Sequence, residues 1–552
     1  MKASAIVAHA RLVAALRSPR CFAHPAGRIE TIETHISTVV LAGKFAYKIK
    51  KPVDLGFADF STLQKRRRAC EAEVRLNRRT APGIYLGVVP VTGSRQRPAF
   101  GGEGRTIEYA VRMRRFPAGR TLYALQRRGV LTLAHVEALA ATVAAFHSRI
   151  AVAGRGGRFG SPARIRKEAL DNFRQIGAVT RDRTVLRTLE RLRAWTDTEF
   201  AKLRPLLEKR RTGGYVRECH GDLHLGNVTL IDGRPVPFDC IEFNAALRWI
   251  DVISEAAFTV MDLLAHGERA LGFHFLNTYL EATGDYEGVE VLRFYLVYRA
   301  LVRAKIAAIR ARRAELKRYL SVATTLAEET REGLVILYGL SGSGKTTFAR
   351  SLGGSLGAIR LRSDVERKRL HGLAAQARSG SKVGAGLYAA QATAATYQRL
   401  AELAGALLPS GFPVIVDAAF LRRSYRDLFR KLARSAGARF VIAACEAPLA
   451  ELRRRVRSSE RTSRDASEAT LAVLERQIAT REALTPAERA AAVVCETADA
   501  RRQAAALAQI ELRLGLSASR RAGPRGLRRR GSARASARRR SAPRTGTART
   551  GG

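Results

Sequence analysis

The sequence predicts two domains of different fold class, an α+β bilobal domain followed by an α/β domain with a parallel sheet, and then a disordered basic tail. Three observations lead to this prediction. The chain has 552 residues, too many for one hydrophobic core. Its last third alternates apolar strands with helical segments, whereas residues 30–53 alternate as a hairpin ahead of long helices. Residues 517–552 are almost only Arg, Ser, Ala, Gly, Pro and Thr, too poor in apolar groups to fold.

Charge and cysteine usage narrow the class of protein. The formal charge is +48, and residues 517–552 hold twelve arginines and no acid, which leaves +36 for the remainder. That excess is spread along the chain without an aromatic-interleaved stripe, so nucleic acid is a possible partner but not the favoured one. The six cysteines are dispersed with no C-x-x-C, which argues against a disulfide framework or zinc site and favours a cytoplasmic protein. No apolar run approaches the ~18 residues of a membrane span.

The first domain is predicted to span residues 1–325, and its first chemistry lies in the hairpin. In the strand 45–50 the apolar side chains share one face, and Lys48 lies on the other with Lys50. A helix over about residues 62–79 follows and carries Glu73. A strand lysine followed by a helix glutamate is how kinase folds grip the α- and β-phosphates of ATP. The alternative is a solvated strand lysine and a surface glutamate.

A second stretch offers the acid and amide groups that phosphoryl transfer requires. His220-x-Asp222 is followed by Asn227 in the spacing H-x-D-x-x-x-x-N. Asp222 would orient the acceptor hydroxyl and accept its proton, while Asn227 would reach Mg²⁺ from the same loop. Asp239, after a short apolar segment, lies where a second magnesium ligand is expected. The alternatives are a fortuitous polar turn or a mononuclear metal site.

The run His-Gly-Asp-Leu-His-Leu-Gly-Asn with the following Phe-Asp resembles the aminoglycoside phosphotransferase and choline kinase family, a branch of the protein-kinase-like fold. The resemblance covers roughly residues 25–320. It implies catalysis by Asp222 within the His220 loop, magnesium ligands at Asn227 and Asp239, and a phosphate-gripping pair at Lys48 and Glu73. One departure is that no G-x-G-x-x-G precedes Lys48. Residues 245–330 hold equal numbers of acidic and basic side chains, so the family name does not give the acceptor.

The second domain, predicted over residues 331–516, opens on a complete phosphate-binding motif. An apolar strand at 334–338 leads into G-x-x-x-x-G-K-[ST], and a helical pattern follows. This geometry points backbone N–H groups and a helix N-terminus at phosphates. Lys345 would reach the β- and γ-phosphates of ATP, and the Thr346 hydroxyl would hold Mg²⁺. The alternative is a glycine-rich turn with a surface lysine. The predicted nucleotide-binding residues are Gly339, Leu340, Ser341, Gly342, Ser343, Gly344, Lys345, Thr346 and Thr347.

Further strands are expected near residues 358–361, 413–417, 439–445 and 492–495, alternating with helices. In a parallel sheet ligands bind at the carboxyl ends of the strands, where Asp364 and Asp417 fall. A helix pair carrying Arg457, Arg461 and Arg464 would close over the phosphates as a lid. The alternative is a solvated basic helix.

Residues 333–512 resemble the small P-loop kinases of the gluconate kinase, polynucleotide kinase and zeta toxin type. The resemblance implies that Asp364 engages an acceptor hydroxyl, with Arg367 near enough to bind an anionic acceptor. Together the two halves predict a bifunctional phosphotransferase that uses ATP and Mg²⁺ on small-molecule hydroxyl acceptors. Two alternatives stay open: one half catalyses while the other senses nucleotide, or the second half phosphorylates polynucleotide 5′ ends.

Overall fold

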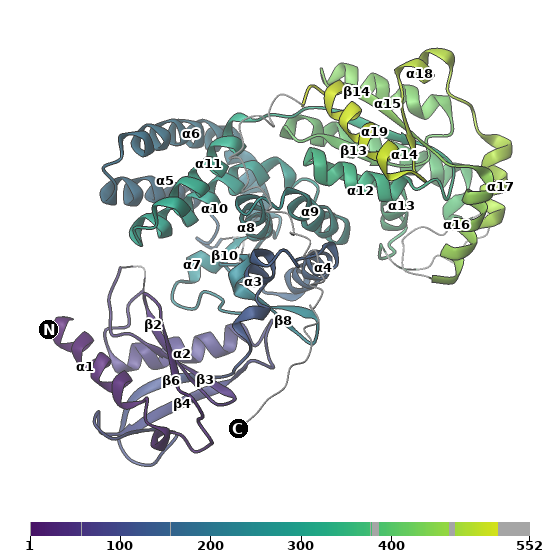
Figure 1. Ribbon diagram of the computed structural model, residues 1–552. Coiled ribbons are helices and arrows are strands. Elements are labelled where there is room, and N and C mark those ends of the chain that lie inside the picture. Colours follow the sequence, from purple (N-terminus) through teal and green to yellow (C-terminus); the bar gives the residue numbers. More distant parts are fainter. Residues whose placement is uncertain are drawn as a thin grey trace, which may run out of the picture.

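The computed structural model describes residues 2–516 apart from residues 57, 155, 376, 378–385 and 463–469. The predicted tail, residues 517–552, lies outside the described residues. Figure 1 shows three bodies along the chain: a strand-rich lobe at the N-terminus, a helical lobe, and a second domain beside that lobe. Within the described residues, no helix is both long enough and apolar enough to cross a membrane.

The N-terminal lobe is built on an antiparallel sheet. Its six strands run in the order β1-β2-β3-β6-β4-β5. The predicted hairpin is confirmed, with β2 paired antiparallel to β3 so that Val39 lies opposite Lys48. Helix α2 begins where the Thr62 hydroxyl accepts a hydrogen bond from Lys65 N–H. The elements of this lobe are α1 (Lys2–Ala15), β1 (Glu30–Glu33), β2 (Ser37–Ala42), β3 (Phe45–Lys50), α2 (Leu63–Asn77), β4 (Tyr85–Gly93), β5 (Pro98–Phe100) and β6 (Thr106–Arg114).

The second lobe is mostly helical and carries the H-x-D loop between short strands. Helices α8 and α10 are buried nearly all round, because they form the centre of the lobe. The elements are α3 (Leu122–Arg127), α4 (Leu133–Arg149), α5 (Pro162–Val179), α6 (Arg183–Thr212), β7 (Val216–Glu218), β8 (Val228–Ile231), β9 (Arg234–Pro237), α7 (Ala245–Arg248), β10 (Trp249–Asp251), α8 (Val252–Ala265), α9 (Arg269–Thr283), α10 (Val289–Ile309) and α11 (Arg313–Glu328).

The second domain has the predicted parallel sheet, with five strands in the order β12-β13-β11-β14-β15. All five residues of the central β11 are buried, as expected for a strand covered on both faces. The elements are β11 (Leu334–Tyr338), α12 (Lys345–Leu356), β12 (Ile359–Arg362), α13 (Ser363–Leu370), α14 (Ala390–Leu407), β13 (Val414–Asp417), α15 (Arg423–Ser435), β14 (Phe440–Glu446), α16 (Leu449–Thr462), α17 (Leu471–Thr480), α18 (Pro486–Ala491), β15 (Val493–Glu496) and α19 (Ala500–Arg513).

The two domains pack directly against each other. Helix α9 of the first domain lies against α12 and β12 of the second (Figure 1). One hydrophobic cluster runs through both, and within it Phe273 of α9 meets Phe412 with ring centroids 6.1 Å apart. This contact was not predicted, because a helix buried by a second domain has the same apolar pattern as a core helix.

Candidate active sites

Lys48 lies at the centre of the first site. Its Nζ is 2.8 Å from Glu73 Oε1 on α2 and 2.5 Å from Asp239 Oδ1, a residue 191 positions further along the chain. Lys48 and Glu73 are both buried, so the alternative of a solvated pair does not hold. Burial opposes the charge of Lys48, but Asp239, Glu73 and Glu242 outweigh it and raise the pKa of the lysine.

A second lysine of β3 extends this cluster. Lys50 binds Glu73 Oε2 at 2.5 Å and also pairs with Glu242, and all three side chains are buried. Glu73 therefore serves two lysines at once. Burial raises the pKa of Glu73, but the two lysines lower it further, to about 2. Sequence reasoning missed Lys50 and Glu242 as partners, although the alternation of β3 had placed Lys50 on the face of Lys48.

Asp222 and Asn227 meet as their spacing predicts. Asn227 Nδ2 donates to Asp222 Oδ2 at 3.0 Å and to its carbonyl at 3.1 Å. Burial opposes the negative charge of Asp222, yet His224, Arg303 and His220 outweigh it and hold the pKa of Asp222 well below its usual range. Asp222 is thus a carboxylate at any physiological pH. His220 Nε2 lies 2.9 Å from the Phe238 carbonyl and its Nδ1 accepts from Asp222 N–H at 3.4 Å, so the ring braces the loop around Asp222.

The backbone of this loop is held by Glu255 of α8. Its carboxylate accepts from His220 N–H at 3.1 Å and from Gly221 N–H at 2.6 Å. His147 Nε2 lies 2.8 Å from the same carboxylate, and His147 Nδ1 lies 2.9 Å from the Tyr279 hydroxyl on α9. Ligand-type atoms of His147, Cys219 and Glu255 gather within 4.8 Å, but both ring nitrogens already have partners, so we assign this cluster to structure and not to a metal.

The groups facing the first site fit a magnesium–nucleotide complex. Asp239 and Asn227 offer the carboxylate and amide oxygens that Mg²⁺ prefers, and the Asp239 side chain is 42% exposed. Asp239 adopts a left-handed backbone (φ +65°), which turns it out of the preceding strand segment toward Lys48. In place of a glycine-rich loop, three residues join β1 to β2. His35 among them accepts from Nε of Arg310, the residue that follows α10, at 2.8 Å.

The P-loop of the second site has the geometry that its motif predicts. Gly342 and Gly344 both have φ of +79°, and a Cβ on Gly342 would lie 2.8 Å from the Leu452 carbonyl. Lys345 begins α12 and donates to the Leu340 carbonyl at 2.7 Å. Burial lowers the pKa of Lys345. A buried ammonium whose hydrogen bond within the described residues goes to a neutral carbonyl is stabilised strongly by a nearby anion. The loop therefore fits a phosphate chain.

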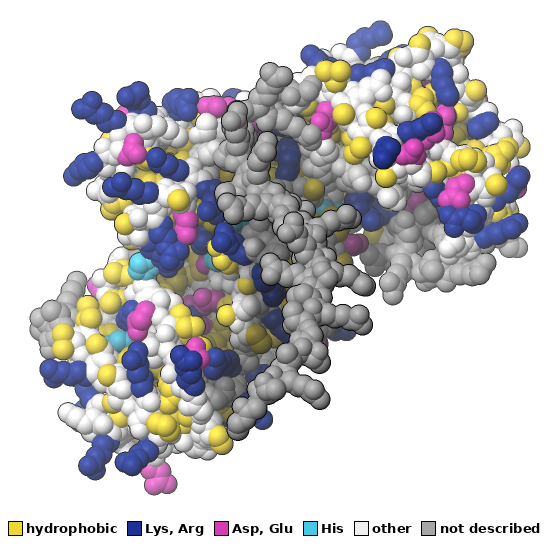
Figure 2. Space-filling model, in the orientation of Figure 1, with side chains coloured by type: hydrophobic (Ala, Val, Ile, Leu, Met, Phe, Trp, Pro, Cys, Tyr) yellow, Lys and Arg dark blue, Asp and Glu magenta, His cyan; other side chains and the backbone are white. Residues whose placement is uncertain are grey.

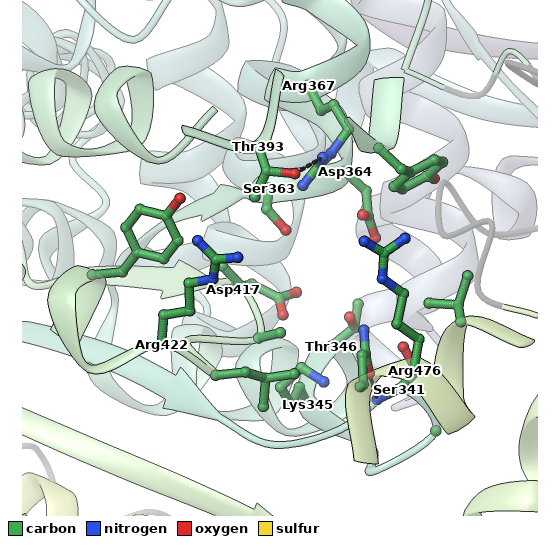
Figure 3. A pocket seen from close by; sticks show the side chains of 18 of the residues that line it. Ser341, Lys345, Thr346, Ser363, Asp364, Arg367, Thr393, Asp417, Arg422 and Arg476 are labelled. Carbon is green, nitrogen blue, oxygen red and sulfur yellow. Dashed lines mark hydrogen bonds between the residues drawn. The ribbon is translucent and has the colours of Figure 1, made fainter. Parts of the chain in front are cut away.

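A cavity of about 460 Å³ opens over this loop (Figure 3). Lys345 and Thr346 line one side and Asp364 with Arg367 line the other, as the labelled side chains show. Asp417 lies between them at the end of β13, and its Oδ2 is buried without a hydrogen-bond partner among the described residues. This carboxylate oxygen and the Thr346 hydroxyl, which lines the same cavity, are a suitable donor set for Mg²⁺ or its waters.

The predicted arginine lid requires a correction. Arg457 of α16 is exposed and is not among the residues lining the cavity. The helix turns Arg455 to the cavity instead, where its Nη1 donates to Thr497 Oγ1 at 3.1 Å; Arg476 of α17 faces it as well. The side chain of Arg461 and the whole of Arg464 lie outside the described residues. The charge pattern had indicated a basic lid, but not which face of α16 points inward.

Comparison with known proteins covers both halves. A family model described as "Phosphotransferase enzyme family" matches residues 66–295, and one described as "AAA domain" matches residues 334–484. A protein of Mycobacterium tuberculosis H37Rv, Rv2004c, is 32% identical over 439 residues, covering 77% of this chain and 86% of its own. A Mycobacterium bovis protein, Mb2027c, matches with the same figures. The aligned stretch is longer than either half of this chain, so the similarity to the mycobacterial proteins extends over parts of both halves.

Solved structures cover parts of the chain. An ethanolamine kinase of Plasmodium vivax is 8% identical with a TM-score of 0.36, over 54% of this chain and 81% of its own. A gluconokinase of Sinorhizobium meliloti 1021 is 23% identical with a TM-score of 0.23, over 34% of this chain and 99% of its own. The family assignment rests on the family models and the mycobacterial relatives.

Proposed function

We propose, for a chain that belongs to the family of these mycobacterial proteins and joins a phosphotransferase-family domain to an AAA domain, that both halves transfer the γ-phosphoryl group of MgATP to small-molecule hydroxyl acceptors. The observation that carries the first half is the meeting of Lys48 with both Glu73 and Asp239. The second half rests on one cavity that brings Lys345 and Thr346 to Asp364 and Asp417. Each site thus offers phosphate-binding, metal-binding and acceptor-facing groups together.

In the first half, Asp222 would receive a hydrogen bond from the acceptor hydroxyl and aim its oxygen at the phosphorus. The depressed pKa of Asp222 makes it a weak base, so its main work is orientation, and it takes the proton as the oxygen–phosphorus bond forms and the β–γ bridge breaks. Lys48 would hold the α- and β-phosphates. When bound, Mg²⁺ at Asp239 and Asn227 would neutralise charge on the leaving phosphates.

In the second half, Asp364 would face the acceptor hydroxyl and Arg367 would bind an anionic group on the same acceptor. Both lie on α13, three residues apart and on one face (Figure 3). Arg367 is buried, its Nη1 is fixed by the Leu387 carbonyl and Thr393, and its Nε has no hydrogen-bond partner among the described residues. A rigid guanidinium with a buried N–H donor that has no hydrogen-bond partner among the described residues favours binding of a carboxylate or phosphate. Lys345, Arg422 and Arg476 lie around the same cavity.

Small molecules are proposed as acceptors in preference to nucleic acid. On the face in Figure 2 the Lys and Arg side chains are dispersed over both domains and form no single stripe. We also propose a cytoplasmic location, which the six free cysteines support.

The test uses the full chain with γ-labelled ATP and a metabolite extract. Products lost in Asp222→Asn belong to the first half, and products lost in Lys345→Ala belong to the second. The double variant serves as the control and should label nothing. Labelled products that survive the double variant would show that neither proposed site carries the transfer. If one single variant loses every product and the other loses none, catalysis is restricted to the half that carries the first variant's substitution.

A further inference from the structure

Helix α9 belongs to the first domain, yet it packs against β12, the edge strand of the P-loop sheet. Asn277 supplies the hydrogen bonds that a neighbouring strand would supply. Its Nδ2 donates to the Ala358 carbonyl at 2.9 Å, and its Oδ1 accepts from Arg360 N–H at 2.7 Å. Because both bonds are buried, these two backbone groups of the edge are paired inside the protein and β12 is fixed to the first domain.

Glu281 lies one turn further along α9 and binds the side chains of β12. Its Oε1 accepts from Arg360 Nε at 3.0 Å and from Nη2 at 2.6 Å, and its Oε2 lies 3.6 Å from Arg362 Nη1. Arg360 and Arg362 share one face of the strand because they are two residues apart. Glu281, Arg360 and Arg362 are all buried, so these charges depend strongly on one another.

Arg362 also lies near Asp417, the carboxylate proposed to hold Mg²⁺ or its waters on the metal side of the P-loop site. Its Nε lies 3.9 Å from Asp417 Oδ2, the buried carboxylate oxygen that has no hydrogen-bond partner among the described residues. A guanidinium that moved onto this carboxylate would form a bidentate pair with it and occupy the oxygen that Mg²⁺ or its waters need. Glu281 attracts the same guanidinium through a different nitrogen, Nη1.

We propose that Glu281, a residue of the first domain, is a positioning residue for the P-loop site, because it holds Arg362 off Asp417 and leaves that carboxylate to the magnesium–nucleotide complex. Asn277 fixes the strand from which Arg362 projects. The metal side of the second site is then incomplete without the first domain. The inference rests on the proposed function of the P-loop half and adds to it a residue outside the matched AAA region.

The test measures how the binding of mant-ATP to the full chain depends on magnesium concentration. Asp239→Ala is the background, so that the first site lacks a magnesium ligand, and the P-loop signal is the part that Lys345→Ala removes. Glu281→Gln should raise the Mg²⁺ needed for half-saturation about fivefold or more. Affinity without Mg²⁺ should not change, because Lys345 and the loop backbone hold the phosphates. Glu287→Gln, which removes a carboxylate paired with Lys209 at the surface, is the matched control.

Arg362→Gln added to Glu281→Gln should restore the original magnesium dependence, since it removes the competing guanidinium. Unchanged magnesium dependence in Glu281→Gln, or no restoration by Arg362→Gln, would overturn the proposal. If Glu281→Gln does not fold, Arg362→Gln alone must need no more Mg²⁺ than the unaltered chain, and a higher requirement overturns the proposal. Absence of any Lys345-dependent binding in the unaltered chain would instead reject the proposed function.

Discussion

The two sites bind the same proposed nucleotide by different means. The first is assembled from side chains far apart in sequence: Lys48 on β3 reaches Glu73 on α2 and Asp239 beyond the H-x-D loop. The second is a contiguous loop in which backbone N–H groups, two left-handed glycines and Lys345 all come from eight residues. The phosphate contacts of the first therefore depend on several elements keeping their positions, whereas those of the second depend on one turn and the sheet beneath it.

Because of this difference, side-chain substitutions in the two sites should change different properties. In the first site, ion pairs also hold the lobes together, so a substitution there changes stability as well as binding. In the second, backbone groups supply most of the phosphate contacts and cannot be removed by changing a side chain. Side chains around the P-loop cavity instead decide charge balance and acceptor choice.

The largest expected effect concerns Asp222, which separates orientation of the acceptor from binding of nucleotide. Asp222→Asn should lower kcat of the first half about 10²–10⁴-fold, or about 3–5 kcal/mol of transition-state stabilisation. MgADP binding should persist, because Lys48, Asp239 and Asn227 remain. Calorimetry and label transfer with the Lys345→Ala chain measure the two quantities. Loss of nucleotide binding with full turnover per bound nucleotide would contradict the role of Asp222.

The same difference decides how much could be predicted from sequence. The whole P-loop could be predicted, because its phosphate-binding residues, the strand before them and the helix after them are contiguous in sequence. Asp222, Asn227 and Asp239 could be predicted from their spacing, because they flank a single short hairpin, β8–β9. Lys50, Glu242 and Glu255 were not, because their partners lie from 23 to 192 residues away and no spacing constrains them. The contact of α9 with β12 was also missed, since a helix buried by a neighbouring domain has the same apolar pattern as a core helix.

The second prediction concerns stability and uses two glutamates of α2. Glu73→Gln should lower the free energy of unfolding by about 3 kcal/mol or more, because it leaves two buried lysines with one carboxylate each. Glu71→Gln is the matched control: Glu71 is exposed, pairs with Arg67 at the surface, and should cost at most about 0.5 kcal/mol. Urea unfolding measures both. Equal costs would mean that the lysine cluster adds nothing beyond a surface pair.

The third prediction concerns how the stability contributed by Glu255, which binds the backbone of the H-x-D loop, depends on pH. Burial raises the pKa of Glu255, but His147, His220 and Gly221 N–H lower it further, to about 2. A carboxyl whose folded pKa lies below its ordinary value near 4.5 stabilises fully above that value, and the contribution disappears as pH falls through about 2. The free energy of unfolding of the unaltered chain should exceed that of Glu255→Gln by about 3 kcal/mol at pH 7. This difference should shrink progressively as the pH falls below about 4.5. A difference that stays constant from pH 7 to pH 3 would contradict this.

The smallest expected effect tests which face of α16 serves the nucleotide. Arg455 lines the cavity and donates toward the Gly342 carbonyl at 3.4 Å and to Thr497, so Arg455→Ala removes a charge next to the phosphate loop. We expect about tenfold weaker mant-ATP binding, equivalent to about 1.4 kcal/mol. Arg457 is exposed two residues later on the same helix, and Arg457→Ala should change binding by less than about 0.5 kcal/mol. The two variants remove the same group from one helix, so global charge cancels in the comparison. A larger effect at Arg457 would mean that α16 rotates when nucleotide binds, and that the P-loop site, like the first, is completed by side chains that must move into place.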